Sequence, residues 1–415
     1  MSDVALHNAI LKREVPQIVA LLIRQAIELN SSDIHIEPAE KVVRVRYRID
    51  GILRLIVEYP FSMHAEVVNL IKIKSKLKID EDRIPQDGRA QQEILGARMF
   101  DLRVSTLPTI HGEKIVMRLQ DRSRKIPKLE ELGIDETNVK IIRKNIAKPN
   151  GIVLTTGPTG SGKTTTLYAC LNILNRAEVN IMTIEDPVEI QLDGLNQSQV
   201  LPTIDYDFAF GLRTGLRQDP DIIMVGEIRD KETMSVAIEA ALTGHLVLST
   251  IHTNSAISTI TRLLNMGLPA FLITASINSI IAQRLVRTIC QDCKKEAPLS
   301  LAVEQQLRET LDSMNPTIRA ELGVEQSNAP LKIFKGSGCS QCGGTGYRGR
   351  VGLYEVLEFK DNLKEMILAK QTDLELEKVA IADRMKKLEH DGVEKVLRGL
   401  TTPEEIYAII KDEHA

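Results

Sequence analysis

The chain has no tryptophan, and aromatic residues make up only 3% of its 415 residues. A surface that binds nucleic acid by stacking bases on aromatic rings is therefore not expected. The net charge is -3, so the composition gives no overall attraction to nucleic acid or to an anionic membrane. No run of about 18 apolar residues occurs, which excludes an ordinary membrane-spanning helix. The first residues lack a basic segment followed by an apolar one, and no signal peptide is expected.

The composition is that of a globular protein, with 43% hydrophobic and 26% charged residues. A chain of this length is too long for one ordinary hydrophobic core, so two or three domains are expected.

A glycine-rich motif at residues 157–164 is the strongest functional signal. It matches the phosphate-binding pattern G-x-x-x-x-G-K-[ST]. An apolar segment at 151–156 predicts a strand before it, and residues 164–175 predict a helix after it. Strand, loop and helix are the setting in which this motif binds a nucleotide, whereas the alternative is a glycine-rich structural turn. The candidate nucleotide-binding residues are Gly157, Pro158, Thr159, Gly160, Ser161, Gly162, Lys163, Thr164 and Thr165.

Each part of this loop has a chemical role in binding ATP. Glycines let backbone N–H groups turn toward phosphate oxygens, and the helix N-terminus adds the positive end of its dipole. Lys163 supplies a positive charge for the β- and γ-phosphates. The Thr164 hydroxyl is a candidate ligand of Mg²⁺.

Residues 1–121 predict a small α+β domain, joined to the rest by a charged linker at 122–128. Apolar residues recur at helical spacing in 15–27. Residues 42–49 alternate between apolar side chains and arginines, as a half-buried strand does. Asp50-Gly51 then predicts a hairpin turn.

A second helix is expected from about Ser62, with lysines on its solvated face. These lysines are Lys72, Lys74, Lys76 and Lys78. Further strands are expected around residues 91–95, 97–105 and 114–119.

Residues 129–285 alternate between strand and helix patterns, which predicts a mostly parallel sheet with helices on both faces. The candidate strands are 152–156, 180–185, 222–225 and 246–250. Residues 286–350 contain two cysteine pairs, and residues 351–415 predict a helical C-terminal subdomain. Its last helix begins at Thr402, where Pro403 and Glu405 complete a capping box.

Two acidic clusters follow predicted strands of this core. Glu185 stands in one cluster, and Glu227 follows the apolar strand at 222–225 in the other. Hydrolysis of ATP requires a carboxylate to hold Mg²⁺ and another to orient or deprotonate water. Glu227 is the first candidate for the water, and Glu185 is the second, either sharing the task or holding the metal. A single acidic residue at a strand end is otherwise a helix cap or a surface charge.

Two histidines flank the strand at 246–250. His245 and His252 are candidates for sensing the γ-phosphate, since a polar side chain at a strand end responds to phosphate loss. A structural histidine is the alternative for each.

Four arginines are candidates for stabilising the transferred phosphoryl charge. Arg103 and Arg118 lie on predicted strands of the N-terminal domain, and Arg213 and Arg217 lie on an amphipathic helix before Glu227. Solvated surface positions are the alternative.

Four of the five cysteines form two C-x-x-C pairs: Cys290 with Cys293, and Cys339 with Cys342. Four thiolates complete a tetrahedral structural zinc site. A vestigial site or redox-active thiols are the alternatives. Cys170 is expected in the core.

The motifs together resemble the ATPases that drive type II secretion and type IV pilus assembly. The resemblance covers about nine-tenths of the chain. It begins with Ser-Asp-Ile-His-Ile-Glu-Pro at 32–38, continues with Val-Arg-Tyr-Arg-Ile-Asp-Gly at 45–51 and Pro-Gln-Asp-Gly-Arg at 85–89, and runs to the tail. The family's Asp box corresponds to 185–189, its Walker B segment ends at Gly226-Glu227, and its His box spans 245–252.

The expected fold is α/β: a RecA-like P-loop NTPase core preceded by a small α+β, PAS-like domain, with a tetracysteine zinc-binding subdomain and a helical tail. The resemblance implies a ring-shaped homohexamer in which the N-terminal domain of one subunit packs on the core of the next. Arg103 and Arg118 would then reach the neighbour's γ-phosphate. The cysteines are typical of secretion and pilus-extension motors. The family's usual regulatory domain before 32–38 is not expected here.

The function expected from this sequence is that of a hexameric ATPase, using ATP, Mg²⁺ and Zn²⁺. It would be cytoplasmic and peripheral to the inner membrane, powering pilus or pseudopilus assembly through an inner-membrane platform protein. Membrane association would come only through partners, and no direct contact with nucleic acid is expected. A DNA-uptake or conjugation motor and a nucleotide-gated binding module are the alternatives.

Overall fold

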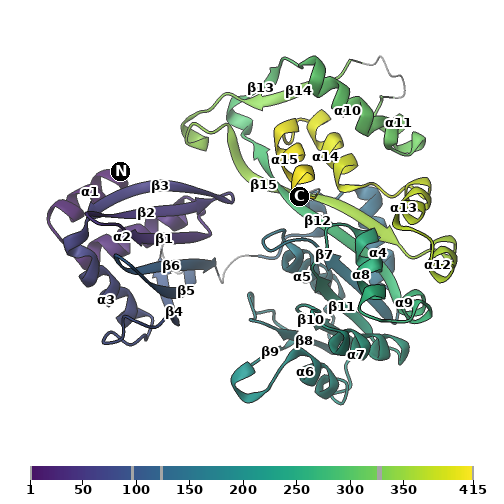
Figure 1. The fold of residues 1–415 in the computed structure, drawn as a ribbon, viewed down its shortest axis with the longest axis horizontal. Coiled ribbons are helices and arrows are strands. Elements are labelled where there is room, and N and C mark those ends of the chain that lie inside the picture. The colour runs from purple at the N-terminus through teal and green to yellow at the C-terminus, as the bar shows by residue number, and fades with distance from the viewer. Residues whose placement is uncertain (1, 95–97, 122–124, 325–329, 414–415) are drawn as a thin grey trace. The chain divides into compact units, whose positions relative to one another are not determined.

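The computed structural model describes residues 2–94, 98–121, 125–324 and 330–413 (Figure 1). Its internal contacts divide the chain into two units, Met1–Lys125 and Ile126–Ala415. Each unit has its own sheet and its own hydrophobic core.

The first unit is an antiparallel sheet with helices on one face. Its strand order is β3-β2-β1-β6-β5-β4. Buried apolar residues of the helices and strands form one cluster. The elements are α1 (Ser2–Leu11), α2 (Val15–Glu28), β1 (Asp33–Pro38), β2 (Val42–Ile49), β3 (Ile52–Pro60), α3 (His64–Lys74), β4 (Gln86–Ile94), β5 (Arg98–Thr109) and β6 (Gly112–Asp121). The α+β character of this unit matches the prediction, whereas its likeness to a PAS domain stays a prediction.

The alternation in β2 is confirmed. Val43, Val45 and Tyr47 are fully buried against the helices, and the intervening arginines lie on the opposite face of the sheet. The hairpin from β2 to β3 turns at Asp50 and Gly51, which both have positive φ angles, of 49° and 86°. A two-residue turn of this kind favours glycine.

Lys72 is not on a solvated face, in contrast to the prediction. Its side chain is fully buried, and Nζ lies 2.6 Å from Glu113 Oε2 on β6. Nζ also donates to the Glu81 carbonyl at 2.8 Å. The run of lysines in the sequence could not indicate this, because the compensating carboxylate lies on a distant strand.

The second unit is built on a sheet of order β15-β12-β7-β11-β10-β8-β9. Neighbouring strands are parallel except β12 and β15, which are antiparallel. The core elements are α4 (Glu136–Ile146), β7 (Gly151–Thr156), α5 (Lys163–Leu174), β8 (Ile181–Glu185), β9 (Asn196–Gln199), α6 (Phe208–Gly215), β10 (Ile222–Val225), α7 (Lys231–Leu242), β11 (Leu246–Ile251), α8 (Ala256–Asn265), α9 (Ala270–Ser276), β12 (Ile277–Ile289) and β15 (Tyr347–Glu358).

Helices cover both faces of this sheet, as predicted. Every residue of β7 is buried. Ile152 and Leu154 join a cluster with α7, α8 and α9, whereas Val153 joins a cluster with α4 and α5 on the other face. Burial on both faces explains why the strand sequence is continuously apolar rather than alternating.

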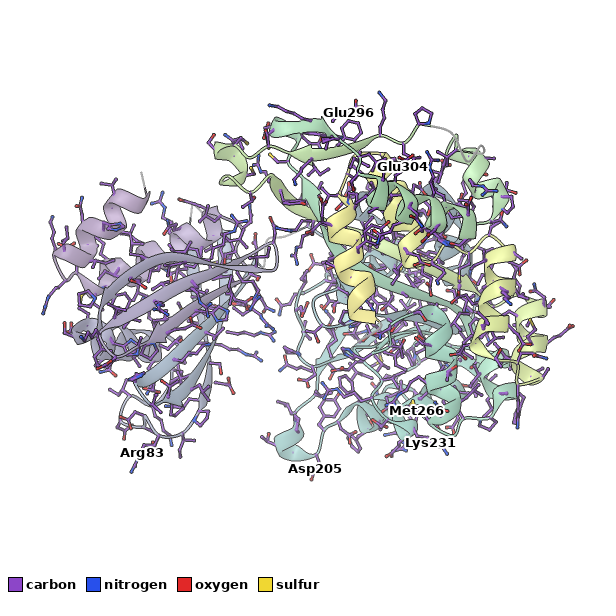
Figure 2. All side chains as sticks on the ribbon, turned by 45° about the horizontal axis from the view of Figure 1, so that its top comes forward. Arg83, Asp205, Lys231, Met266, Glu296 and Glu304 are labelled. Carbon is purple, nitrogen blue, oxygen red and sulfur yellow. The ribbon has the colours of Figure 1, made fainter. Side chains whose placement is uncertain are left out.

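A small subdomain between β12 and β15 contains β13 (Lys294–Ala297), α10 (Leu301–Ser313), α11 (Pro316–Glu321) and β14 (Ile333–Gly336). Glu296 on β13 and Glu304 on α10 mark it in Figure 2, away from Lys231 and Met266 at the other end of the unit. The predicted boundaries at 285/286 and 350/351 each fall inside a strand, β12 and β15. The expected helical subdomain therefore begins with residues of the main sheet.

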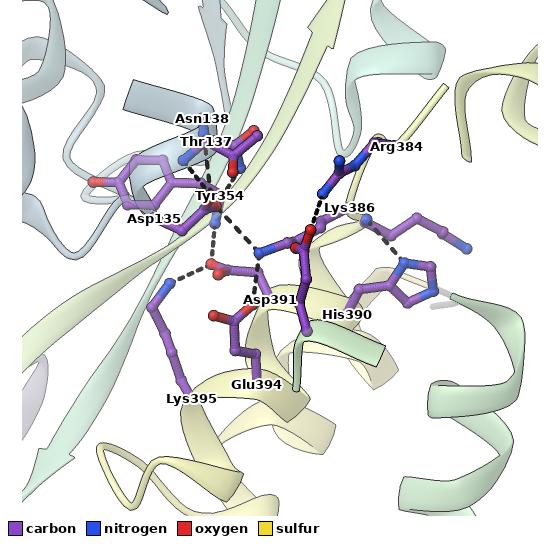
Figure 3. Close-up of polar contacts among 12 residues, drawn as sticks. Asp135, Thr137, Asn138, Tyr354, Arg384, Lys386, His390, Asp391, Glu394 and Lys395 are labelled. Atoms are coloured by element: carbon purple, nitrogen blue, oxygen red, sulfur yellow. Dashed lines mark hydrogen bonds and ion pairs between the residues drawn. The ribbon is translucent and has the colours of Figure 1, made fainter. Parts of the chain in front are cut away.

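The tail is helical after β15, with α12 (Asp361–Leu368), α13 (Asp373–Ala382), α14 (Leu388–Leu397) and α15 (Pro403–Glu413). A buried polar cluster ties it to the core (Figure 3). Lys386 Nζ lies 2.6 Å from Glu394 Oε2 and 3.5 Å from Asp135 Oδ2, the residue that caps α4. Asp391 accepts from the Tyr354 backbone N–H at 2.7 Å and pairs with Lys395.

Candidate nucleotide and metal sites

The phosphate-binding loop connects the C-terminal end of β7 to the first turn of α5. Gly157, Gly160 and Gly162 all have positive φ angles, of 147°, 80° and 89°, which L side chains rarely adopt. A Cβ on Gly157 would also lie 2.4 Å from the Gln283 carbonyl oxygen. The loop therefore needs glycine both for its backbone shape and for its close contact with β12.

Lys163 lies in the loop and contacts its carbonyl groups. Nζ donates to Gly157 O at 2.7 Å and to Pro158 O at 3.1 Å. The pKa of Lys163 is lowered to about 8, chiefly by burial, with Glu227 raising it in part and Arg284 lowering it. An incoming phosphate would supply the negative charge that this partly desolvated ammonium lacks.

Two further observations fit a bound phosphate and Mg²⁺. The Ser161 hydroxyl is buried and has no hydrogen-bond partner among the described residues. The half-buried Thr164 stands on the first turn of α5, and the Glu227 carboxylate is close enough to influence Lys163. Hydroxyl and carboxylate oxygens are the donors that Mg²⁺ prefers.

Glu227 follows β10 and is held by two side chains. Arg229 Nη2 lies 2.5 Å from Oε1, and His252 Nε2 lies 3.4 Å from Oε2. The Glu227 side chain is 17% exposed, whereas that of His252 is 48% exposed. The structure thus brings Glu227, His252 and Lys163 to one edge of the sheet, the edge at which ligands of such sheets bind.

Glu185 lies at the end of β8 and is almost fully buried. Its carboxylate accepts from Tyr168 Oη at 2.5 Å, Thr183 Oγ1 at 2.6 Å and Gln197 Nε2 at 3.1 Å. Burial raises the pKa of the carboxyl, and these donors lower it in part. A carboxylate enclosed by three protein donors has little capacity left to orient water.

The other core candidates lie away from the phosphate loop of the chain. His245 precedes β11 rather than following it, and its carbonyl accepts from Gly151 N at the start of β7. It therefore lies at the opposite edge of the sheet. Arg213 Nη2 pairs with Glu232 Oε1 at 2.7 Å on the surface. Arg217 donates to the Arg213 carbonyl at 2.9 Å, beyond the end of α6.

Gln283 and Arg284 on β12 were missed by sequence reasoning. Gln283 contacts the loop at Ser161 and α5 at Thr166, and Arg284 Nη2 donates to Asn254 O at 3.0 Å. Both side chains are buried. A polar pair inside the apolar segment 280–286 was the available signal, since buried polar residues usually have a specific partner.

In the first unit, Arg103 and Arg118 are direct cross-strand partners on β5 and β6. The same row continues to Arg89 on one side and to Asp33 and then Arg48 on the other. Cross-strand partners share one face of the sheet, so four arginines and one aspartate form what we call the arginine row. A hollow of about 530 Å³ is lined by Arg89, Arg103, Arg118 and neighbouring residues.

The two cysteine pairs come together between β12 and β15. The Sγ atoms of Cys290, Cys293, Cys339 and Cys342 lie within 4.8 Å of one another. Three of the S···S distances are 3.7, 3.8 and 4.0 Å, close to the edge of about 3.8 Å expected for a tetrahedral zinc site with Zn–S bonds of ~2.3 Å. The donor set and geometry therefore fit a closed zinc site. Cys170 is fully buried on α5, apart from this cluster.

Residues 10–408 match the family model "Type II/IV secretion system protein". The chain is 44% identical over 396 residues to Type II secretion system ATPase E of Vibrio cholerae, covering 95% of this chain and 75% of that protein. It is 46% identical over 393 residues to the type IV pilus assembly ATPase PilB of Myxococcus xanthus, covering 94% and 67%.

Solved structures share the fold. The pilus retraction motor PilT with bound ADP is 25% identical and matches with a TM-score of 0.61, covering 93% of this chain and 95% of that one. The ATPase DotB of Legionella pneumophila is 23% identical, with a TM-score of 0.66 and 96% coverage of both chains, which shows the fold alone. None of the helices in the described residues has the length and apolarity needed to cross a bilayer.

The phosphate-binding loop, the carboxylate beside it and these similarities agree with one another. The chain belongs to the type II/IV secretion system protein family and is an ATP hydrolase of that family.

Proposed function

We propose that this protein is an Mg²⁺-dependent, homohexameric motor. Its ATPase activity would power assembly of a type IV pilus or a type II secretion pseudopilus through an inner-membrane platform protein. It would work in the cytoplasm at the surface of the inner membrane. The similarity to secretion ATPase E and to PilB supports this assignment.

The proposal is supported above all by the location of the charged groups that ATP hydrolysis needs, which belong to two different units of the chain. The phosphate loop and Glu227 lie in the second unit, whereas the arginine row lies in the first. Phosphoryl transfer benefits from arginine beside the γ-phosphate, often supplied by a neighbouring subunit. Arg103 and Arg118 of one subunit would therefore complete the site of the next.

Within one subunit, the loop backbone and Lys163 would bind the phosphates. Glu227 would orient the attacking water and accept its proton, with Arg229 and His252 fixing its direction. His252 would sense loss of the γ-phosphate through its contact with Glu227. Mg²⁺ held at Thr164 would neutralise phosphate charge when bound. Glu185, enclosed by its three donors, would shape the site rather than contact water.

Subunit mixing tests the shared site. Glu227→Gln and Arg118→Ala would each abolish most turnover alone. In a mixed hexamer, an Arg118→Ala subunit still has Glu227, and a neighbouring Glu227→Gln subunit still supplies Arg118. A site formed by these two subunits therefore contains both wild-type groups. In rings assembled at random from equal amounts, about a quarter of the sites are of this kind and should recover activity. Arg44→Ala, which removes an exposed arginine elsewhere on the first sheet, is the control.

The oligomeric state is measured by light scattering in the same samples. No recovery on mixing, in rings of verified size, would show that the arginine acts within its own subunit. Turnover by a verified monomer would reject the shared site. Stimulation by DNA would favour a DNA-uptake or conjugation motor, and nucleotide exchange without phosphate release would favour a nucleotide-gated module.

A further inference from the structure

Gln283 lies where β12 extends past the end of β7. The two parallel strands pair up to Ala282 and Thr156. The residue after β7 is Gly157, the first residue of the phosphate loop, whereas β12 continues with Gln283. The register of the sheet therefore places this glutamine beside the loop.

The Gln283 side chain makes two hydrogen bonds, one to the phosphate loop at Ser161 and one to helix α5 at Thr166. Nε2 donates to the Ser161 carbonyl at 2.6 Å, and Oε1 accepts from Thr166 Oγ1 on α5 at 2.8 Å. Only 1% of Gln283 is exposed. A carbonyl can only accept, so the amide nitrogen must face Ser161, and this orientation leaves the oxygen for Thr166.

We propose that Gln283 is a positioning residue that holds the phosphate-binding loop in the shape that accepts a nucleotide. A phosphate loop works only if its backbone N–H groups point toward the ligand and its carbonyl groups point away. The Gln283 amide keeps the Ser161 carbonyl turned toward β12 and out of the phosphate space. Thr166 keeps the amide in the correct orientation.

The packing around the loop leaves little room for another arrangement. A Cβ on Gly162 would lie 3.0 Å from Gln283 Nε2, and one on Gly157 would lie 2.4 Å from Gln283 O. The loop is therefore in direct contact with both the side chain and the backbone of Gln283. This proposal rests on the ATPase activity of the family and does not require the arginine row to act between subunits.

Gln283→Met tests the proposal, because methionine has a similar length and no hydrogen-bonding amide. Binding of ADP to the purified full chain, measured by calorimetry, should weaken by about tenfold, the scale of one or two lost hydrogen bonds. Hydrogen–deuterium exchange should rise in the peptide covering 157–166. Thr166→Val, which removes only the orienting hydroxyl, should weaken ADP binding by a smaller factor.

Asn145→Ala is the matched control. Asn145 is another fully buried amide, which donates to Ile141 O and to Glu358 Oε1 away from the loop. It should lower the melting temperature and leave ADP affinity unchanged. Unchanged affinity and exchange in Gln283→Met would overturn the proposal, as would an equal loss of affinity in Asn145→Ala. If Gln283→Met does not fold, the Thr166→Val variant tests the proposal instead. Wild-type ADP affinity and wild-type hydrogen exchange of the loop in Thr166→Val would reject the orienting contact and, with it, the proposal.

Discussion

Arg118 Nε donates a hydrogen bond to Asp33 Oδ1 at 3.1 Å across the paired strands β6 and β1. The other carboxylate oxygen accepts from Ser32 Oγ at 2.8 Å and lies 3.6 Å from Arg48 Nε. Asp33 is 9% exposed, whereas the Arg118 side chain is 62% exposed. A fixed carboxylate thus sets the direction of an arginine whose side chain reaches solvent.

Asp33→Ala should lower the ATPase kcat by about tenfold to a hundredfold, since a misdirected arginine loses most of its effect on the transition state. ADP affinity and ring size should not change. Glu58→Ala, which removes an exposed ion pair with Arg44 on the same sheet, should leave kcat unaltered. Full activity of Asp33→Ala, beside an inactive Arg118→Ala, would show that Arg118 needs no carboxylate partner.

Binding of ADP should take up a proton at alkaline pH. The pKa of Lys163 is lowered to about 8, mainly by burial, and a bound phosphate raises it again. At pH 9 most free protein has a neutral Lys163, so binding should absorb nearly one proton, and at pH 7 about a tenth of one. ADP affinity should accordingly fall as the pH rises above 8.

Calorimetry in buffers of different ionisation enthalpy measures this uptake. Lys163→Arg is the control, because its guanidinium stays charged at both pH values. Equal uptake by wild type and Lys163→Arg at pH 9 would assign the proton to another group.

The cysteine cluster should hold one zinc ion per chain, measured by elemental analysis. Cys339→Ser should abolish zinc binding and lower the melting temperature by roughly 5 °C or more, the scale of ~2 kcal/mol in a unit of this size. ADP affinity should be retained, because the cluster lies outside the nucleotide site. Cys170→Ala should keep its zinc. A metal-free wild-type protein with the same melting temperature would contradict this prediction.

Stability should fall between pH 6.5 and 4 because of His390. Burial lowers the pKa of this histidine to about 4, and its ring is held between Ser313 Oγ at 2.9 Å and the Lys387 backbone N–H at 3.2 Å. Over this range the unfolded chain binds a proton that the folded chain does not, so acid favours unfolding. The expected loss of unfolding free energy is about 3 kcal/mol.

Urea unfolding at several pH values measures this loss. His390→Gln should be less stable at pH 7 and should lose less stability on acidification than the wild type. Equal slopes for the two proteins would show that another group carries the acid sensitivity.

Local patterns predicted the parts of the fold that depend on neighbours in sequence. The strand, loop and helix around Lys163 and the alternation at Val43, Val45 and Tyr47 follow directly from periodicity and turn chemistry. Lys72 could not be placed in this way, since its burial depends on Glu113, a residue of another strand.

The residues of the nucleotide site could be predicted where they belong to one continuous motif. They could not be predicted where the site is formed by segments that are far apart in the sequence. Glu227 follows its strand, so its edge of the sheet could be inferred. His245 flanks its strand as expected, but it precedes the strand and so lies at the edge of the sheet opposite Glu227. Gln283 is more than a hundred residues from the loop it contacts, and only the pairing of β12 with β7 brings them together.

The antiparallel pairing of β12 with β15 makes the cysteine subdomain an excursion from two adjacent strands. The chain leaves the sheet after Ile289 and returns at Tyr347, and the four cysteines meet at the base of this excursion. After a single proteolytic cut within it, the two fragments would therefore stay together, because β12 of one fragment remains hydrogen-bonded to β15 of the other. The nicked protein should migrate as two fragments under denaturing conditions and still behave as one folded particle.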